Sequence, residues 1–460
     1  MNIYIQVEIS SRELDSKLLL ATLAASKGHN VLVSSSPEII KGLKNGLLNP
    51  GVFHTKSLTP SKTKIQRHQE IIDNNSVITS IDEEAVINID GYDQFAIDRY
   101  SEISIAQSSA VFGWGDQDVD SLKAKYPTVA SKIYKTGSPR VDLWKPSFSK
   151  YWKNPKDMPK KPYLLISSTI FVTSVRPFHE GVKLNYAAGY FERDPELFKR
   201  NFYSMSDDYR KLYVFIDAIK HLAKNSNGYD IVVRPHPVEN IEAWKIFLKN
   251  VQNVHVIRND SITAWVKNSF AVMHSACTTG IEASISGVPV LSYNHPELQQ
   301  DKEILSNQLG YSINSKAELL EKVKELFKLK FTKKKNNNKL EVPSVISKKV
   351  YIDNQELAAE KTIKVWESFS QELLSQPNNW IKFYCYLKII NLKPLFRNFM
   401  NKLFPKVFKS KNDNHKFPPI EGNDIKERVK RFENLLGIKT KIKCQILSER
   451  TILVRKNKFN

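Results

Sequence analysis

The chain has 460 residues, enough for more than one domain, and its hydrophobic share of 41% and charged share of 25% are ordinary for a globular protein. A net charge of +21 favours a polyanionic partner, such as nucleic acid, an acidic membrane surface or an anionic substrate. The three cysteines, Cys277, Cys385 and Cys444, are far apart and odd in number, which argues against a disulfide framework or a zinc site and for a reducing compartment.

The first 150 residues alternate predicted strands and helices. A strand over 2–9, a helical face from Leu14 to Ala25 that ends at Gly28, and a strand over 31–33 form a strand–helix–strand opening. This opening is typical of a doubly wound domain. No G-x-G-x-x-G pattern follows the first strand, so a standard dinucleotide site is not expected there.

Two polar segments of this part follow predicted strands. The acids 82–84 come directly after a strand over 76–80, either as a solvated turn or as carboxylates directed into a cleft, and position alone slightly favours the turn. Farther along, the turn 137–139 contains Gly and Pro and presents Arg140 and Asp142. The alternative for this second segment is a structural turn with a local ion pair.

A second α/β alternation follows a stretch from Trp144 to Lys161 that is rich in Lys, Pro and aromatic residues and is interpreted as a linker. A strand over 162–169 ends in hydroxyl residues, as expected for the first strand of a new domain. Residues 178–202 read as an irregular loop, and helices are predicted over 207–222 and 315–327.

The composition changes after Leu329. A basic polar run over 333–339 predicts a loop, and 380–408 mixes aromatic residues with Lys and Arg. That mixture fits an interfacial amphipathic segment or a core-packing helix with a basic outer face, with equal weight. Residues 425–454 suggest a small helix–strand appendix. The predicted domains are 1–150, 162–329 and 330–460, and the last is a basic, partly amphipathic extension.

The strand over 231–233 runs into Arg234-Pro235-His236-Pro237. Prolines on both sides restrict the backbone of His236 and so preset the direction of its imidazole. An Arg and a His at the carboxyl end of a strand could hold a diphosphate or stabilise a leaving phosphate. The alternative is a loop histidine with a capping role.

A second anion-friendly segment follows the strand over 270–273. Ser275, Thr278 and Thr279 precede or open a helix, where hydroxyl and backbone N–H groups can bind phosphate oxygens. Glu282, about one turn inside that helix, could accept hydrogen bonds from ribose hydroxyls. The alternatives are an N-cap for either threonine and a capping-box acid for Glu282.

These motifs carry a resemblance. Arg234-Pro235-His236-Pro237, the run from His274 to Ala283 and Gly287-Val288-Pro289-Val290 resemble the nucleotide-binding half of GT-B glycosyltransferases with cytidine-nucleotide donors, such as teichoic-acid glycerophosphotransferases and capsule Kdo transferases. The N-terminal part resembles the bacterial surface carbohydrate biosynthesis proteins, which are similar to β-Kdo transferases. The segments that carry this second resemblance are 7–9, 12–21, 82–84, 112–115 and 136–142.

The resemblance implies an α/β protein of the GT-B class, with two Rossmann-like domains facing a cleft and a basic C-terminal extension. It implies that 1–150 is the acceptor and catalytic domain and that 162–329 binds the nucleotide sugar. It implies a glycosyltransferase of capsule, O-antigen or lipopolysaccharide biosynthesis that transfers a Kdo-like sugar from a CMP-activated donor, with no cofactor and no metal. The expected nucleotide- and substrate-binding residues are Arg140, Arg234, His236, Ser275, Thr278, Thr279 and Glu282. The expected catalytic residues are Glu83 or Glu84 as general acid/base and Asp142 as nucleophile or oxocarbenium stabiliser.

The expected partners are a nucleotide-sugar donor, a lipid-linked glycan acceptor and the anionic inner leaflet, which the basic tail would contact. The sequence shows no signal-peptide pattern and no apolar run long enough to span a bilayer, so we expect a cytoplasmic, peripheral protein. Two alternatives stay open: transfer of a polyol phosphate from a CDP-polyol, and a non-enzymatic polyanion-binding protein. Nucleic acid is not an expected partner, because no RRM, KH or zinc pattern is present.

Overall fold

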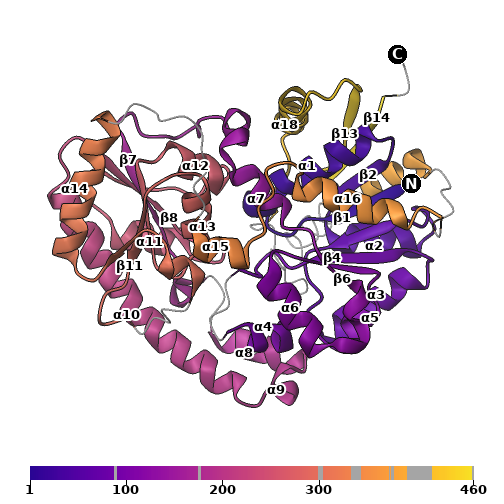
Figure 1. The fold of residues 1–460 in the computed structure, drawn as a ribbon, viewed down its shortest axis with the longest axis horizontal. Coiled ribbons are helices and arrows are strands. Elements are labelled where there is room, and N and C mark those ends of the chain that lie inside the picture. Colours follow the sequence, from indigo (N-terminus) through magenta and orange to yellow (C-terminus); the bar gives the residue numbers. More distant parts are fainter. Residues whose placement is uncertain are drawn as a thin grey trace, which may run out of the picture. The chain divides into compact units, whose positions relative to one another are not determined.

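The computed structural model describes residues 1–86, 91–174, 178–298, 304–332, 343–371, 373, 378–390 and 417–457. The chain folds into two compact units whose segments alternate along the sequence (Figure 1). Unit 1 consists of Met1–Glu83, Phe95–Leu143 and Tyr351–Asn460, and unit 2 of Glu84–Gln94 and Trp144–Val350.

Unit 1 is built on an eight-stranded sheet in the order β13-β14-β2-β1-β3-β4-β5-β6. The strands β2, β1, β3, β4, β5 and β6 are parallel, and all but the edge strand β6 are buried along nearly their whole length, as is typical of strands covered on both faces. The strand order reverses between β1 and β3, which is the topological switch point of this sheet. The strands are β1 (Asn2–Gln6), β2 (Asn30–Ser34), β3 (Val52–Thr55), β4 (Val77–Ile81), β5 (Ala110–Gly113), β6 (Ile133–Lys135), β13 (Ile442–Ser448) and β14 (Thr451–Lys456).

Helices connect these strands. Helix α1 begins with polar and charged residues and becomes largely apolar from Leu18, and it is buried from Glu13 to Ala25, with contacts to α16, α18 and β14. The helices with residues in unit 1 are α1 (Ser10–Ser26), α2 (Ser36–Lys44), α3 (Lys62–Ile72), α4 (Gly91–Arg99), α5 (Glu102–Ala106), α6 (Asp116–Lys125), α7 (Pro139–Trp144), α16 (Ala358–Ser368) and α18 (Gly422–Leu435).

The C-terminal residues complete unit 1, whereas the sequence suggested an extension with a small appendix. Strand β14 pairs antiparallel with β2, for example Leu453 with Leu32, and so covers what would otherwise be an open sheet edge. In α16, the buried indole of Trp366 donates its Nε1–H to Oγ1 of Thr79, at 3.0 Å. The sequence did not reveal that β14 pairs with β2, because this pairing joins residues more than 400 positions apart.

The predicted interfacial segment 380–408 is described only over its first part. Residues 380–390 are helical, and 391–408 lie outside the described residues. Within the helix, Phe383 and Leu387 are buried, whereas Ile381 and Ile389 are exposed. This part therefore has both a packed face and an exposed apolar face, and the basic loop predicted over 333–339 also lies outside the described residues.

Unit 2 contains a six-stranded parallel sheet in the order β12-β11-β10-β7-β8-β9. If β7 is counted as strand 1 of this unit, the order read from β9 to β12 is 3-2-1-4-5-6, the order of the Rossmann fold. The switch point of this sheet lies between β7 and β10. The strands are β7 (Tyr163–Ser167), β8 (Asp230–Arg234), β9 (Val254–Val256), β10 (Ala271–His274), β11 (Val290–Tyr293) and β12 (Tyr311–Ile313).

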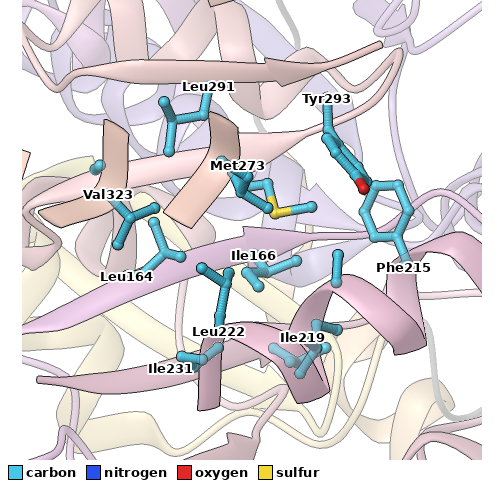
Figure 2. Packing of buried hydrophobic residues seen from close by; sticks show 14 of the residues in the cluster. Leu164, Ile166, Phe215, Ile219, Leu222, Ile231, Met273, Leu291, Tyr293 and Val323 are labelled. Carbon is cyan, nitrogen blue, oxygen red and sulfur yellow. The ribbon is translucent and has the colours of Figure 1, made fainter. Parts of the chain in front are cut away.

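The core of unit 2 lies between this sheet and helices α10 and α14. Figure 2 shows strand residues such as Ile166 and Met273 packed against Phe215, Ile219 and Leu222 of α10. These three residues recur at helical spacing, so one face of α10 is apolar. The helices of unit 2 are α8 (Phe178–Ala187), α9 (Tyr190–Arg193), α10 (Leu197–Lys224), α11 (Ile241–Phe247), α12 (Ile262–Asn268), α13 (Thr278–Ile285), α14 (Lys316–Thr332) and α15 (Ser344–Lys349).

The prediction of an irregular loop over 178–202 was wrong, because α8, α9 and the first turns of α10 lie in this segment (Figure 1). The reason is physical: these turns lack a buried apolar face, and a buried face is what periodicity detects. Phe198, Phe202 and Tyr209 of α10 are 48%, 50% and 60% exposed. Burial on α10 begins at Asp208 and becomes regular only from Val214 onward.

The fold-class prediction is confirmed for the α/β architecture and for two Rossmann-like units, the pair expected of the GT-B class. The units are not the consecutive domains 1–150 and 162–329 drawn from the sequence, since the chain from Tyr351 rejoins unit 1. Among the described residues, none of the helices is both long enough and apolar enough to cross a membrane.

Candidate functional site

The carboxyl ends of β7 and β10 flank the switch point of unit 2. In an open α/β sheet this is where ligands bind, because the loops that leave neighbouring strands diverge there. Hydroxyl residues follow β7 at Ser168 and Thr169, and the segment 275–277 leads from β10 into α13. Both segments match the polar strand ends that the sequence predicted.

A chain of side-chain hydrogen bonds joins the two strand ends. Oγ of Ser167 lies 3.0 Å from Oγ1 of Thr279 and 3.3 Å from Sγ of Cys277. The Thr169 hydroxyl donates to the carbonyl oxygen of Ser275, at 3.1 Å. The end of β7 therefore fixes the position of the first turn of α13.

The first turn of α13 has the features of an anion-binding helix terminus. Its N-cap is Cys277, whose side chain makes no capping hydrogen bond, and Thr278 opens the helix in a partly exposed position. Ala276 has a left-handed backbone (φ +53°), and its N–H donates to Oδ1 of Asn307, at 2.8 Å. The backbone N–H groups and the positive end of the helix dipole thus face the strand edge, where they favour a negative charge.

Packing against His274 requires a glycine at position 280. A Cβ at this position would lie 2.2 Å from Nε2 of buried His274, so any other residue would displace that imidazole. Burial lowers the pKa of His274 to about 3, so the ring is neutral, and it accepts the N–H of Cys277 at Nδ1, at 3.4 Å. His274 therefore supports the loop from beneath as a packing residue.

His236 lies at the end of β8 on the other side of β7. Strand β7 separates β8 from β10, so the loops after them start about 10 Å apart. Nδ1 of His236 accepts the N–H of Val238, at 3.3 Å, which leaves the proton of a neutral ring on Nε2. The ring also stands edge-on to Phe171, with 5.6 Å between centroids.

Glu239 holds this loop, although the sequence interpretation did not single it out. Its carboxylate is fully buried, and burial raises its pKa, while the donors around it favour the ionised form. The donors are Ser168 Oγ (2.9 and 3.1 Å), Ile170 N (3.1 Å), Thr173 Oγ1 (3.1 Å), His236 N (3.0 Å) and Trp244 Nε1 (2.6 Å). One side chain therefore ties the loop after β7 to the loop after β8. An acid three residues after the histidine is the signal that could have identified it.

Arg234 is placed differently from the expectation of a phosphate ligand. Its buried guanidinium donates to the carbonyl oxygens of Asn259 and, at 3.1 Å, of Asp260, and it lies 5.4 Å from the ring centroid of Trp265. Burial lowers the pKa of Arg234 to about 10. Its described contacts brace the strand end from within the unit, and a role in ligand binding stays a prediction.

Glu282 is buried one turn into α13, near cationic side chains. Burial lowers the pKa of Lys267 to about 8, and the charge of Glu282 partly opposes this shift. The Lys267 ammonium donates to the carbonyl oxygen of Trp144, at 3.1 Å. The prediction that Glu282 binds ribose hydroxyls stays a prediction.

A lysine and an aspartate from α10 also reach the edge of the sheet. Nζ of Lys211 donates to Oγ1 of Thr169, at 3.3 Å, and burial lowers its pKa. Asp208 accepts the N–H of Phe171, at 2.7 Å, and burial raises its pKa to about 6. Lys211 adds a cation beside the switch point that sequence reasoning missed, because the helix carrying it is far from the motif in sequence.

In unit 1, Glu83 lies in a buried charge cluster. Its Oε1 accepts from Nζ of Lys17, at 2.5 Å, and Nη1 of Arg140 is 3.8 Å from its Oε2 and 2.8 Å from its carbonyl oxygen. Burial raises the pKa of Glu83, but the charges of Lys17, Arg140 and Arg12 outweigh it, and the pKa is lowered. Glu83 is therefore ionised at neutral pH.

The neighbouring acids are placed in different surroundings. Asp82 is buried and accepts two hydrogen bonds from Arg99, at 2.8 and 3.0 Å. The solvated-turn interpretation is therefore wrong for Asp82 and Glu83, while Glu84 is partly exposed and belongs to unit 2. Asp142 is buried, and its Oδ2 accepts the N–H of Ala359 in the first turn of α16, at 3.0 Å.

The structure thus gathers His236, Ser275, Thr278 and Thr279 at one edge of the unit 2 sheet, with Glu239 and Lys211 beside them. It pairs Glu83 with Arg140 in unit 1. In the described parts of the chain, no three His, Cys, Asp or Glu side chains come together as a metal ion would require.

Comparison with known proteins gives likeness at the level of fold. No protein-family model and no curated protein sequence matches this chain. The chain is similar to the UDP-GlcNAc 2-epimerase of Methanocaldococcus jannaschii in complex with UDP-GlcNAc and UDP, with 14% identity and a TM-score of 0.49 over 80% of this chain and 100% of that one. For the UDP-GlcNAc 2-epimerase of Neisseria meningitidis bound to UDP-GlcNAc, the identity is 14% and the TM-score 0.45, over 80% and 100% of the two chains.

A variant of the wall teichoic acid polymerase TagF with CDPG is similar at 12% identity and a TM-score of 0.41, over 71% of this chain and 73% of that one. Identities and TM-scores this low carry no argument about activity. The case for a function therefore depends on the residues of the site.

Proposed function

We propose that this protein is a glycosyltransferase that binds the nucleotide of an activated sugar at the carboxyl edge of the unit 2 sheet. The observation that carries the proposal is the arrangement at the switch point. The first turn of α13, with Thr278 at its start, adjoins the hydroxyl-bearing end of β7, and His236 is fixed across from it. A phosphate group suits these donors better than a neutral ligand would.

The donor proposed first is a CMP-activated, Kdo-like sugar, on the basis of the sequence resemblance. The Nε2–H of His236 and the N–H groups of α13 would stabilise the negative charge on the departing CMP. Ser275, Thr278 and Thr279 would bind its phosphate oxygens, and Glu282 its ribose hydroxyls. Arg234 would contribute mainly by holding the strand end in place.

Glu83, Glu84 and Asp142 would supply the chemistry at the sugar. Glu83 is ionised, so it fits a general base or an electrostatic stabiliser better than a general acid. Glu84, which is partly exposed, would then be the general acid. Asp142 would act as nucleophile or oxocarbenium stabiliser, with its carboxylate oriented by the Ala359 N–H. Arg140 would hold Glu83 and bind substrate.

The acceptor proposed is a lipid-linked glycan at the anionic inner leaflet, which the net charge of +21 supports. Transfer of a polyol phosphate from a CDP-polyol is a second candidate on the same sequence resemblance, since both donors carry cytidine. Both reactions release CMP, so product detection alone does not separate them.

The deciding experiment supplies each donor separately. The protein is incubated with membranes or a synthetic acceptor and either CMP-Kdo or CDP-glycerol, and incorporation of the labelled group is measured. Incorporation from CMP-Kdo supports the proposal, and incorporation only from CDP-glycerol selects the second candidate. Incorporation from neither, together with salt-sensitive binding to anionic polymers, would favour a polyanion-binding protein.

A further inference from the structure

The sheet of unit 1 has its own switch point, between β1 and β3. Glu8 follows β1 and Lys56 follows β3, and Nζ of Lys56 lies 2.7 Å from Oε2 of Glu8. Ser57, the next residue, is buried. The carboxyl ends of these two strands are therefore joined by an ion pair with a buried hydroxyl beside it.

Lys64 extends into this region from the first turn of α3. Its Nζ donates to Oγ of Ser57, at 2.7 Å, and lies 3.5 Å from the carbonyl oxygen of Ser57. Both of these acceptors are neutral. Within the described residues, no carboxylate lies within ion-pair distance of Lys64, and its side chain remains partly exposed to solvent.

The charges around Lys64 are unbalanced. Its pKa is lowered to about 8, first by burial and then by the cations Arg99 and Lys56, against smaller contributions from Asp82 and Glu8. Both acids are already bound by those two cations: Asp82 by Arg99, at 2.8 and 3.0 Å, and Glu8 by Lys56. Among the described residues, the ammonium of Lys64 is therefore left without a carboxylate partner, and a partly buried ammonium without a counter-ion is costly.

The Ser57 hydroxyl adds a donor to this group. Its oxygen accepts from Lys64 and, at 3.4 Å, from the hydroxyl of Thr59. A hydroxyl that accepts in this way still has its own proton to donate. The described contacts of Ser57 do not use that proton.

We propose that Lys64 and Ser57, in the positive field of Lys56 and Arg99, form a binding site for an oxyanion, either a phosphate or a carboxylate. The ligand would supply the missing negative charge and accept from the ammonium and the hydroxyl. This inference rests on the proposed function, because unit 1 would then hold an anionic group of the acceptor while unit 2 holds the nucleotide. It names residues of unit 1 only and requires no particular arrangement of the two units.

The test is a calorimetric titration of the full chain with inorganic phosphate, and separately with glucuronate, in the presence of excess CMP. Three proteins are compared: the wild type, Lys64→Ala, and Arg67→Ala as a control that removes a positive charge from an exposed position of the same helix. We expect Lys64→Ala to weaken binding of at least one anion tenfold or more, and Arg67→Ala to change it less than twofold. The anion that responds identifies the group as phosphate or carboxylate.

Two results would overturn the inference: wild-type protein that binds neither anion, or Lys64→Ala binding both within twofold of the wild type. Circular dichroism checks that each variant is folded, and Lys64→Gln replaces Lys64→Ala if the latter is not. CMP affinity should be the same in all three proteins. A failure of CMP to bind would contradict the proposed function but leaves the comparison between Lys64→Ala and the wild type valid.

Discussion

The buried carboxylate of Glu239 accepts the backbone N–H of His236, at 3.0 Å, and so fixes the loop that carries the imidazole. The same carboxylate binds Ser168 and Ile170 from the loop after β7. Arg258 braces the loop from the other side by donating to the carbonyl oxygen of Glu239, at 2.7 Å. The direction of His236 is therefore set by the unit 2 scaffold before any ligand arrives.

Glu239→Gln should destabilise the protein and weaken CMP binding together. Oε1 and Oε2 both accept from N–H groups that cannot reverse their role, so an amide NH₂ in place of either oxygen would face a donor. The expected loss is about 1–3 kcal/mol of unfolding free energy, measured by urea denaturation. Glu242→Gln, at an exposed position of the next helix, is the matched control. Wild-type stability and CMP affinity in Glu239→Gln would show that the carboxylate does not hold the loop.

His236→Ala should weaken CMP binding by about tenfold, a difference of about 1.4 kcal/mol, without unfolding the protein. The side chain is partly exposed and its loss leaves no large cavity, so the melting temperature should change little. Affinity is measured by calorimetry, with His179→Ala as a control at an exposed histidine. Unchanged affinity for CMP would remove His236 from the phosphate site.

Glu83→Gln should cost about 3–5 kcal/mol at pH 7, because it leaves Lys17 buried without its carboxylate. The pKa of Glu83 is lowered in the folded protein, so the stability it contributes is present above the unfolded value of 4.5 and is lost as pH falls through the folded value. The difference between wild type and variant, followed by denaturant unfolding across pH, should therefore shrink only below pH 4.5. A difference that is constant down to pH 3, or is absent at pH 7, would contradict this assignment.

Trp366→Ala should destabilise unit 1 by about 3–5 kcal/mol, through loss of a buried indole and its hydrogen bond to Thr79. Ile389→Ala, at an exposed position of the helix over 380–390, should change stability by less than about 0.5 kcal/mol. Thermal unfolding measures both variants.

The same packing means that a chain cut after Leu329 would lose β13, β14 and α16 and should not fold as unit 1. If that shortened chain kept the wild-type melting temperature, the C-terminal part would not be integral to the unit.

The sequence predicted local features well and long-range ones poorly. Strands that end in polar residues, such as β8 before His236 and β10 before Ser275, could be recognised because apolar runs and punctuating residues are local signals. The role of Glu239 depends on Ser168, which is 71 positions away, and the return of β14 to β2 joins opposite ends of the chain. No pattern within one segment specifies such partners.

The candidate site shows the same division. The residue types at positions 275–279 predict a turn that supplies backbone N–H groups and hydroxyls after β10, and the structure has that turn, while anion binding by it stays a prediction. The side chain of Arg234 binds protein carbonyls instead, and that of Asp142 binds the N–H of Ala359, and these contacts depend on elements that only folding brings close. Sequence reasoning thus located the edge of the sheet but not the direction of each side chain.

The most direct test of the central claim is a thermal-shift titration with CMP, CDP, UDP, GDP and ADP on the wild type and on Thr278→Val. A ligand that binds only the folded state raises the melting temperature, and at equal concentration the tighter ligand raises it more. The account predicts stabilisation by CMP above the other nucleotides, and a much smaller shift in Thr278→Val. Stabilisation by UDP or GDP instead would contradict the cytidine donor, and no shift with any nucleotide would contradict a nucleotide site at the edge of the unit 2 sheet.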